Sequence, residues 1–263
     1  MQTPGNIIIT GASSGIGAAL ATDFARPGIT LGLIGRDAAR LGATENRCRE
    51  RGAEVATGLI DVTDSNAMSV WLLEFDTKHP VDLVIANSGI TDSLPTTALH
   101  EPADVVHHIV DVNFKGVVNT VLPLVARMRE RGQGHIAIMS SITALRGIPV
   151  IPAYSASKAA LKSYFEALRV RLAPHGIAVS IICPGYIQTP MTDGIRGFKY
   201  PILPLDNAVR RIRHGLARRR PLMVFPWSLR LLLGCVNLMP ETLADRALRL
   251  MFPVRTGRPR APG

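Results

Sequence analysis

Tyr154 and Lys158 are the two residues whose types and spacing most directly indicate chemistry. Residues four apart lie on the same face of a helix, one turn from each other. A free tyrosine has a pKa of about 10, which is too high for proton exchange near neutral pH. A neighbouring ammonium favours the phenolate, so the pair predicts a lowered pKa for Tyr154. A packed tyrosine beside a solvated lysine would show the same spacing, and the rest of the chain must decide between the two interpretations.

Ser141 stands directly after an apolar run, Gly134–Ser140, which predicts a buried strand that ends in a loop. Its hydroxyl is expected to meet the Tyr154 oxygen across a cleft. There it would hold a substrate oxygen while the tyrosine exchanges a proton with it.

A glycine-rich turn follows the first predicted strand, Gly5–Thr10. Gly11 permits a tight turn, Gly15 lets the backbone approach a pyrophosphate, and Gly17 lets the next helix pack closely on the strand. The helix carries an apolar stripe of Ile16, Leu20 and Phe24. Strand, turn and helix together predict a site for a dinucleotide phosphate. The spacing departs from the general GxGxxG fingerprint, so a glycine turn without a ligand is the alternative.

The second predicted strand, Ile29–Ile34, ends in Gly-Arg-Asp. An acid at this strand end selects a free ribose 2′-hydroxyl, whereas an arginine accommodates a 2′-phosphate. Arg36 therefore favours NADP over NAD. Asp37 is better placed as the N-cap of the helix that follows.

Strands and helices alternate through the rest of the chain. Further strands are predicted at Val55–Ile60, Pro80–Ala86 and Ile177–Cys183, and helices at 102–131, 152–172 and 206–220. This alternation predicts an α/β fold with a parallel sheet covered by helices on both faces. Ligands bind beyond the carboxyl ends of the strands in such sheets. The candidate residues at or just past strand ends are Gly11, Arg36, Asp61, Asn87, Ser141 and Pro184.

Composition excludes several classes of protein. A chain of 263 residues with 47% hydrophobic and 19% charged residues is expected to form one large globular unit. The three cysteines predict reduced thiols in a cytoplasm. They have no metal-ligand spacing, and the histidines pair with no cysteine or acid, so no metal site is expected. No signal peptide is expected, because the apolar stretch near the N-terminus, Ile7–Ile9, is too short for an export segment. No spanning helix is expected either, because the longest apolar candidate, 221–240, is interrupted by Pro226 and Arg230.

The net charge of +10 belongs to the C-terminal part of the chain. Residues 1–198 hold 17 Lys+Arg and 17 Asp+Glu, whereas residues 199–263 hold 13 basic and 3 acidic residues. Apolar helices flanked by arginines are predicted at 227–238 and 241–252. They could cap the substrate cleft or a subunit interface, or lie on an anionic membrane surface. Nucleic-acid binding is disfavoured because no stacking aromatics alternate with the arginines.

Over residues 5–226 these motifs resemble the short-chain dehydrogenase/reductase family. The cofactor turn matches in Thr10–Gly17 and the adenine contact in Asp61-Val62. Asn87-Ser88-Gly89 stands where the family usually has Asn-Ala-Gly, and Ala86 replaces a common asparagine. Pro184-Gly185 and Thr189 match the segment that holds the nicotinamide carboxamide, and 223–226 is similar to the last strand. The catalytic tetrad matches in order and spacing in Asn113, Ser141, Tyr154 and Lys158.

The resemblance implies a Rossmann-type, doubly wound, parallel seven-stranded sheet with helices on both faces and a helical C-terminal extension. Residues 1–226 would form the NAD(P)-binding catalytic domain, and 227–263 an extension of the same domain. The implied cofactor is NADP(H), with NAD(H) as the alternative. Its implied contacts are Gly11, Ser13, Ser14, Gly15, Ile16, Arg36, Asp61, Val62, Asn87, Ser88, Gly89, Tyr154, Lys158, Pro184, Gly185, Ile187 and Thr189.

The resemblance also implies a reaction, the transfer of a hydride between nicotinamide C4 and a carbonyl or secondary alcohol. Tyr154 would donate or accept the proton, and Lys158 would lower its pKa and hold the nicotinamide ribose. Ser141 would stabilise the substrate oxygen, and Asn113 would anchor a water that links Lys158 to solvent. The family commonly forms dimers or tetramers, so a homodimer or homotetramer is expected.

The expected function is therefore an NADP-preferring oxidoreductase in the cytoplasm, acting on an apolar small molecule. An apolar lid is expected at 191–204, a segment that contains Phe198 and Tyr200. Nucleic acid is not an expected partner, and peripheral membrane contact through 227–263 stays open. The alternative from another class is an NADP(H) sensor or scaffold that acts through its basic C-terminal extension.

Overall fold

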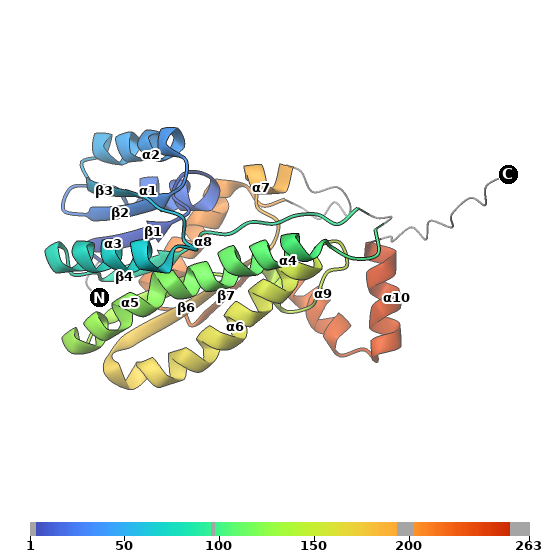
Figure 1. The fold of residues 1–263 in the computed structure, drawn as a ribbon. Coiled ribbons are helices and arrows are strands. Elements are labelled where there is room, and N and C mark those ends of the chain that lie inside the picture. Colours follow the sequence, from blue (N-terminus) through green and yellow to red (C-terminus); the bar gives the residue numbers. More distant parts are fainter. Residues whose placement is uncertain (1–3, 96–97, 194–201, 253–263) are drawn as a thin grey trace.

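A seven-stranded parallel sheet forms the centre of the protein, in the order β3-β2-β1-β4-β5-β6-β7. The computed structural model describes residues 4–95, 98–193 and 202–252 (Figure 1). The strands are β1 Asn6–Thr10, β2 Thr30–Gly35, β3 Glu54–Leu59, β4 Leu83–Ala86, β5 Gly134–Met139, β6 Ile177–Pro184 and β7 Leu222–Phe225. This is the predicted Rossmann-type architecture, with boundaries within a few residues of those expected.

Helices cover both faces of the sheet. One face is buried by α1 (Gly15–Phe24), α2 (Ala38–Glu50) and α8 (Leu205–Ala217), whose apolar residues share a core cluster with β1 and β2. The other is buried by α3 (Ser65–Lys78), α5 (Gly116–Arg131) and α6 (Pro152–Leu172). The remaining elements are α4 (Ala103–Val110), α7 (Pro190–Asp193), α9 (Trp227–Asn237), α10 (Glu241–Met251) and three short helical turns, η1 (Asp111–Lys115), η2 (Ile142–Ala144) and η3 (Ala173–His175).

The strand order reverses between β1 and β4, which pair directly in parallel register. In an open parallel sheet, the chain leaves two neighbouring strands toward opposite faces at such a point, and a crevice opens beyond their carboxyl ends. The predicted site residues therefore come from the loops that surround one crevice.

The helix starts follow local hydrogen-bonding chemistry. Asp37 accepts a hydrogen bond from the Arg40 backbone N–H at 2.9 Å, which confirms it as the N-cap of α2. Asp64 caps α3 in the same way, through the N–H groups of Asn66 and Ala67. Both carboxylates therefore have structural roles at helix termini.

The predicted helix 102–131 is continuous but contains a turn of π-helix, η1, with Asn113 at its centre. By its length and apolar composition, the helical stretch 103–131 could cross a membrane. The expectation that no stretch meets these two criteria is therefore wrong. A buried core helix meets the same criteria, and Val117, Val121 and Leu124 are buried against the sheet. Packing in the core accounts for the apolar composition of this helix.

His135 is buried at the amino end of β5, on the side of the sheet away from the crevice. Its Nε2 lies 2.8 Å from Ser180 Oγ, and Ser180 in turn donates to the Arg220 carbonyl at 2.7 Å. Ser180 has one proton to donate, so His135 Nε2 must be the donor to it. Burial, reinforced by the charge of Arg219, lowers the pKa of His135 to about 4.

We expect the free energy of unfolding to decrease as the pH falls from about 6.5 towards 4, because of the lowered pKa of His135. The pKa of His135 is lower in the folded protein than in the unfolded chain. Its contribution to the free energy of unfolding is therefore fully present above pH 6.5 and decreases below that pH, because unfolding then takes up a proton. The loss between pH 7.5 and pH 5 should be about 2 kcal/mol. Urea unfolding at both pH values, with His135→Gln as the variant that keeps a donor, measures it. An equal loss in both proteins would contradict this account.

Candidate active site

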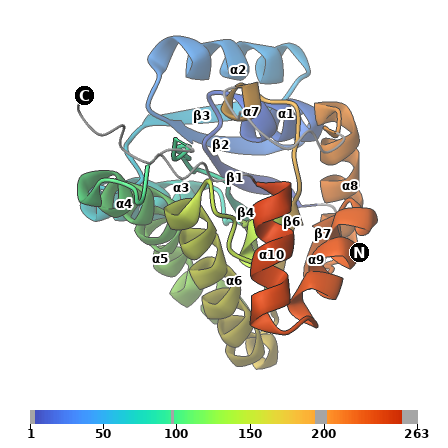
Figure 2. The same ribbon diagram turned by 90° about the vertical axis from the view of Figure 1, so that its right-hand side faces the viewer.

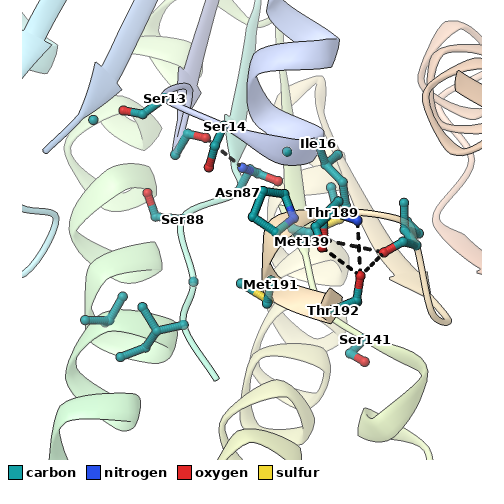
Figure 3. A pocket seen from close by; sticks show the side chains of 18 of the residues that line it. Ser13, Ser14, Ile16, Asn87, Ser88, Met139, Ser141, Thr189, Met191 and Thr192 are labelled. Atoms are coloured by element: carbon teal, nitrogen blue, oxygen red, sulfur yellow. Dashed lines mark hydrogen bonds between the residues drawn. The ribbon is translucent and has the colours of Figure 1, made fainter. Parts of the chain in front are cut away.

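A cleft of about 290 Å³ lies beyond the carboxyl ends of the strands and brings most of the predicted residues together (Figure 3). The predicted residues that line it are Gly11, Ser13, Ser14, Gly15, Ile16, Arg36, Val62, Asn87, Ser88, Gly89, Ser141, Tyr154, Lys158, Pro184, Gly185, Ile187 and Thr189. Asp61 and Asn113 are absent from this lining. Each instead contacts a residue that does line it, Asp61 through Arg36 and Asn113 through Ile90.

The glycine turn between β1 and α1 has the conformation that the sequence predicts. Gly11 and Gly15 have φ of +66° and +54°, the left-handed region that favours glycine. A Cβ on Gly17 would lie 2.3 Å from the Gly11 carbonyl oxygen, so helix and turn could not approach as they do. The turn therefore requires its glycines for geometric reasons.

The same turn fits the phosphates of a dinucleotide. Ser13 Oγ is buried in the cleft and has no hydrogen-bond partner within the described residues. Ser14 is the N-cap of α1, and its side chain makes no capping hydrogen bond to the first turn. A buried hydroxyl and the N-terminal N–H groups of a helix are thus available to phosphate oxygens.

Charged residues surround the end of β2, where the sequence places the adenosine ribose. Arg36 Nη1 lies 3.0 Å from Asp61 Oδ2, in a pair whose side chains are both partly exposed. Burial acts to raise the pKa of Asp61, but hydrogen bonds from Thr63 and Arg36 outweigh it, so the pKa lies below its usual value. Asp37 is engaged by Arg40 through both backbone and side chain. Arg40 is thus bonded to the N-cap residue of α2. Arg36 lines the cleft at the end of β2 and takes no part in that cap.

Asn87 joins the ends of β4 and β1. Its Nδ2 donates to the Thr10 carbonyl at 3.1 Å, and its backbone N–H and that of Ser88 donate to Thr10 Oγ1. A Cβ on Gly11 would lie 2.8 Å from Asn87 Nδ2. The Asn-Ser-Gly segment is thereby held against the glycine turn.

Ser141 and Tyr154 meet at the other end of the cleft. Ser141 is buried after β5, and its Oγ accepts a hydrogen bond from the Thr143 N–H at 3.2 Å, which leaves its own proton for donation. Burial raises the pKa of Tyr154 to about 12, although the hydrogen bond with Ser141 acts to lower it. The meeting of the two hydroxyls agrees with the sequence analysis.

The prediction that Lys158 lowers the pKa of Tyr154 is wrong for this structure. Lys158 Nζ lies 5.6 Å from the centroid of the Tyr154 ring and donates to the Met139 carbonyl at 2.9 Å. Burial lowers the pKa of Lys158 itself to about 8. Helical spacing places the ammonium over the ring, but removal of both groups from water has the larger effect on their pKa values.

Asn113 binds the loop after β4 to helix α6. Its Oδ1 accepts from the Ile90 N–H at 2.7 Å, and its Nδ2 donates to the Ile90 carbonyl and to Ser157 Oγ. A Cβ on Gly89 would lie 3.2 Å from both Asn113 Oδ1 and Lys158 Nζ, so glycine permits this close approach. The π turn and the amide thus position the loop beside Lys158, and the water link stays a prediction.

The segment after β6 closes the cleft on its other side. Gly185 N–H donates to the Phe225 carbonyl at 2.7 Å. Thr192 Oγ1 shares its proton between the carbonyls of Ile187 and Thr189, at 2.7 and 2.8 Å (Figure 3). These contacts hold Pro184, Gly185, Ile187 and Thr189 along the cleft. Most of the predicted lid, 194–201, lies outside the described residues.

Sequence reasoning missed several residues that line the cleft. Five of them lie at a strand end or within two residues of it, the one signal that could have found them: Gly35, Asp37, Ile60, Met139 and Ser140. Four others lie further along loops and helices, where no local signal marks them: Arg40, Ile90, Val112 and Pro190. Met191 and Thr192 belong to the predicted lid, 191–204, but were not singled out as site residues. The described residues contain no cluster of three or more His, Cys, Asp or Glu side chains that could hold a metal ion.

The C-terminal helices pack on the loop that follows Ser141. Leu248 of α10 joins Phe252 in an apolar cluster with Ile148 and Ile151, and the Tyr154 ring packs against it. Arg146 of the same loop pairs with Glu241 at 2.6 Å and lies 4.0 Å from Asp245. Of the interpretations left open by the sequence, a cap beside the predicted site residue Tyr154 matches this packing.

The model of the short chain dehydrogenase family matches residues 5–199, and the chain belongs to this family of oxidoreductases. An uncharacterized oxidoreductase of Myxococcus xanthus is 34% identical over 92% of this chain and 95% of its own length. One from Staphylococcus saprophyticus is 32% identical over 76% of this chain and 86% of its own. A short-chain dehydrogenase from Sphingobium yanoikuyae, solved in complex with NADPH, superposes with a TM-score of 0.78 at 26% identity, covering 98% of both chains.

Proposed function

We propose that the protein transfers a hydride between a nicotinamide cofactor and a carbonyl or secondary alcohol of an apolar small molecule, with Tyr154 as the general acid and base. One observation carries the proposal: Ser141 and Tyr154 line the same cleft as the glycine turn, at the end opposite to it. The bound nicotinamide supplies or accepts the hydride. The protein's own groups handle the proton and the substrate oxygen.

Each polar residue has a defined task in this proposal. In reduction, the Tyr154 phenol gives its proton to the substrate oxygen, and the Ser141 hydroxyl donates its proton in a second hydrogen bond to that oxygen, in place of its contact with Tyr154. In oxidation the same steps run in reverse. With pKa values of about 12 and about 8, Tyr154 is protonated and Lys158 is mostly charged near neutral pH. Lys158 would hold ribose hydroxyls of the cofactor, and Asn113 acts by fixing the loop beside it.

The substrate is proposed to be apolar because apolar side chains line the cleft and pack on Tyr154. Ile90, Val112, Met139 and Met191 line the cleft, and the cluster of Ile148 and Ile151 packs on Tyr154. For partners and location, we propose a homodimer or homotetramer in the cytoplasm.

The reaction is tested by following nicotinamide absorbance with NADPH and a panel of aromatic ketones and aliphatic aldehydes, and with NADP and the matching alcohols. We expect turnover of at least one compound and a strong loss of it in Ser141→Ala. If no compound is turned over, and deletion of 227–263 abolishes capture of a protein partner, the sensor or scaffold function is favoured instead.

NADP is the proposed cofactor, and Arg36 the proposed contact of its 2′-phosphate. We expect Arg36→Ala to weaken NADPH binding about tenfold, which corresponds to about 1.4 kcal/mol, and to leave NADH binding unchanged. Arg26→Ala, an exposed arginine outside the cleft, is the control. Fluorescence titration with each cofactor measures both constants, and an equal effect on NADPH and NADH would show that Arg36 does not read the phosphate.

A further inference from the structure

The outer face of α9 and α10 exposes large apolar side chains. Trp227 is 73% exposed, Leu231 58% and Leu238 88% on α9 and its end, and Leu243 and Leu250 are 48% and 85% exposed on α10. We call these five residues the outer stripe. Within each helix they recur at spacings of one or two turns, so they share one side, while the opposite side is buried. An exposed apolar patch of this kind marks an interaction surface.

The charges around the outer stripe are positive. Arg230, Arg246 and Arg249 are exposed and make no side-chain hydrogen bond or ion pair with any residue in the described ranges. The two acids of α10, Glu241 and Asp245, both face Arg146. In the sequence, residues 253–263 add three arginines and no acid. The surface thus offers apolar area together with uncompensated cations.

Charge complementarity decides between the partners that could cover this face. A second copy of the chain across a two-fold axis would bring the same arginines against each other, and like charges disfavour that contact. A nucleic acid would need stacking aromatics, and Trp227 is the single aromatic residue of the outer stripe. An anionic bilayer satisfies both features, because acyl chains take up the apolar side chains and phosphates pair with the arginines.

We infer that α9 and α10 dock the protein on an anionic membrane surface, with the outer stripe in the boundary between headgroups and acyl chains. Figure 1 shows the two helices at one end of the molecule, and Figure 2, which looks onto that end, shows them side by side beyond β6 and β7. The helix pair is also anchored for this task. Its inner side packs on Ile148, Ile151 and, through α9, on Ile142.

Docking of this kind would give a membrane-dissolved substrate a short route to the site. The buried side of α10 belongs to the cluster that packs on the Tyr154 ring, so the catalytic end of the cleft is the end that approaches the bilayer. This consequence rests on the proposed function, whereas the docking itself does not. The substrate class it indicates is a lipid-soluble carbonyl or alcohol.

The test is sedimentation of the full-length protein with vesicles of phosphatidylcholine and phosphatidylglycerol, compared with vesicles of phosphatidylcholine alone. We expect binding to the anionic vesicles and much weaker binding to the neutral ones. Neutralising the arginines in Arg230→Gln/Arg246→Gln/Arg249→Gln should weaken binding roughly 100-fold, and Leu231→Glu/Leu250→Glu should abolish it.

Matched variants carry the same changes to other exposed positions. Arg26→Gln/Arg127→Gln/Arg129→Gln and Leu59→Glu/Leu99→Glu should bind the vesicles like the unmodified protein. Equal loss in test and control variants would overturn the inference. So would an unmodified protein that stays in the supernatant, or a Leu231→Glu/Leu250→Glu protein that drops to a smaller mass by light scattering. NADPH binding is measured on the same samples, so failure of the proposed oxidoreductase function is scored separately.

Discussion

Replacing Tyr154 by phenylalanine is expected to lower kcat roughly 10³-fold without loss of cofactor binding. The change removes one hydroxyl, the group proposed to exchange the proton, at the end of the cleft that Ser141 also lines. The ring keeps its apolar contacts with Ile148 and Ile151 and its place beside the Lys158 ammonium. The fold and the affinity for NADPH should therefore be preserved while proton exchange with the substrate fails. Steady-state kinetics and NADPH titration of the same preparation measure both.

Tyr164→Phe is the matched control for this prediction. Tyr164 lies on the same helix, α6, is 37% exposed and packs its ring edge against Phe114 and Phe165. It lines no part of the cleft. This variant should keep kcat within twofold of the unmodified protein (about 0.4 kcal/mol). Near-normal activity in Tyr154→Phe would remove the tyrosine from the proposed mechanism.

Replacing Arg131 by alanine is expected to cost about 3–5 kcal/mol of the free energy of unfolding. Arg131 forms two hydrogen bonds with the Asp76 carboxylate, at 2.8 and 2.9 Å, and the Asp76 side chain is 3% exposed. The pair joins the last turn of α5 to the last turn of α3. Without the guanidinium, a buried carboxylate would keep the Val81 N–H as its remaining hydrogen-bond donor. Urea unfolding at neutral pH measures the difference.

Arg127→Ala is the comparison on the same helix. Arg127 lies 3.9 Å from Glu130 in a pair that is largely exposed, and such pairs contribute at most about 1 kcal/mol. If Arg131→Ala unfolds at the same urea concentration as Arg127→Ala, the buried pair has no special structural role. Activity does not enter this test, because both arginines lie outside the cleft.

The sheet and much of the cleft could be predicted because their signals are local. Apolar runs bounded by glycine, asparagine, aspartate, serine or proline mark the strand ends, and parallel topology brings those ends together. The glycine turn, Asp37 as an N-cap and the position of Ser141 follow from a few adjacent residues. Each of these features depends on neighbours in the sequence, so one chain is enough to find it.

The features that sequence reasoning missed depend on contacts between distant residues. The pKa of Tyr154 follows burial by elements that include α10, not the nearby Lys158. The Asp76–Arg131 pair joins residues on two different helices, and no local pattern indicates it. The π turn at Asn113 is stabilised by the amide contacts with Ile90 and Ser157, which the sequence alone does not reveal. Tertiary packing determines all three.

The central claim is that this cleft binds a nicotinamide dinucleotide and prefers NADPH. Fluorescence titration of the purified protein with NADPH and with NADH tests it before any substrate is known. We predict saturable binding of both, tighter for NADPH by about tenfold, or about 1.4 kcal/mol. Equal or tighter binding of NADH would contradict the role given to Arg36. Binding of neither cofactor would contradict the assignment of the glycine turn, and with it the proposed reaction.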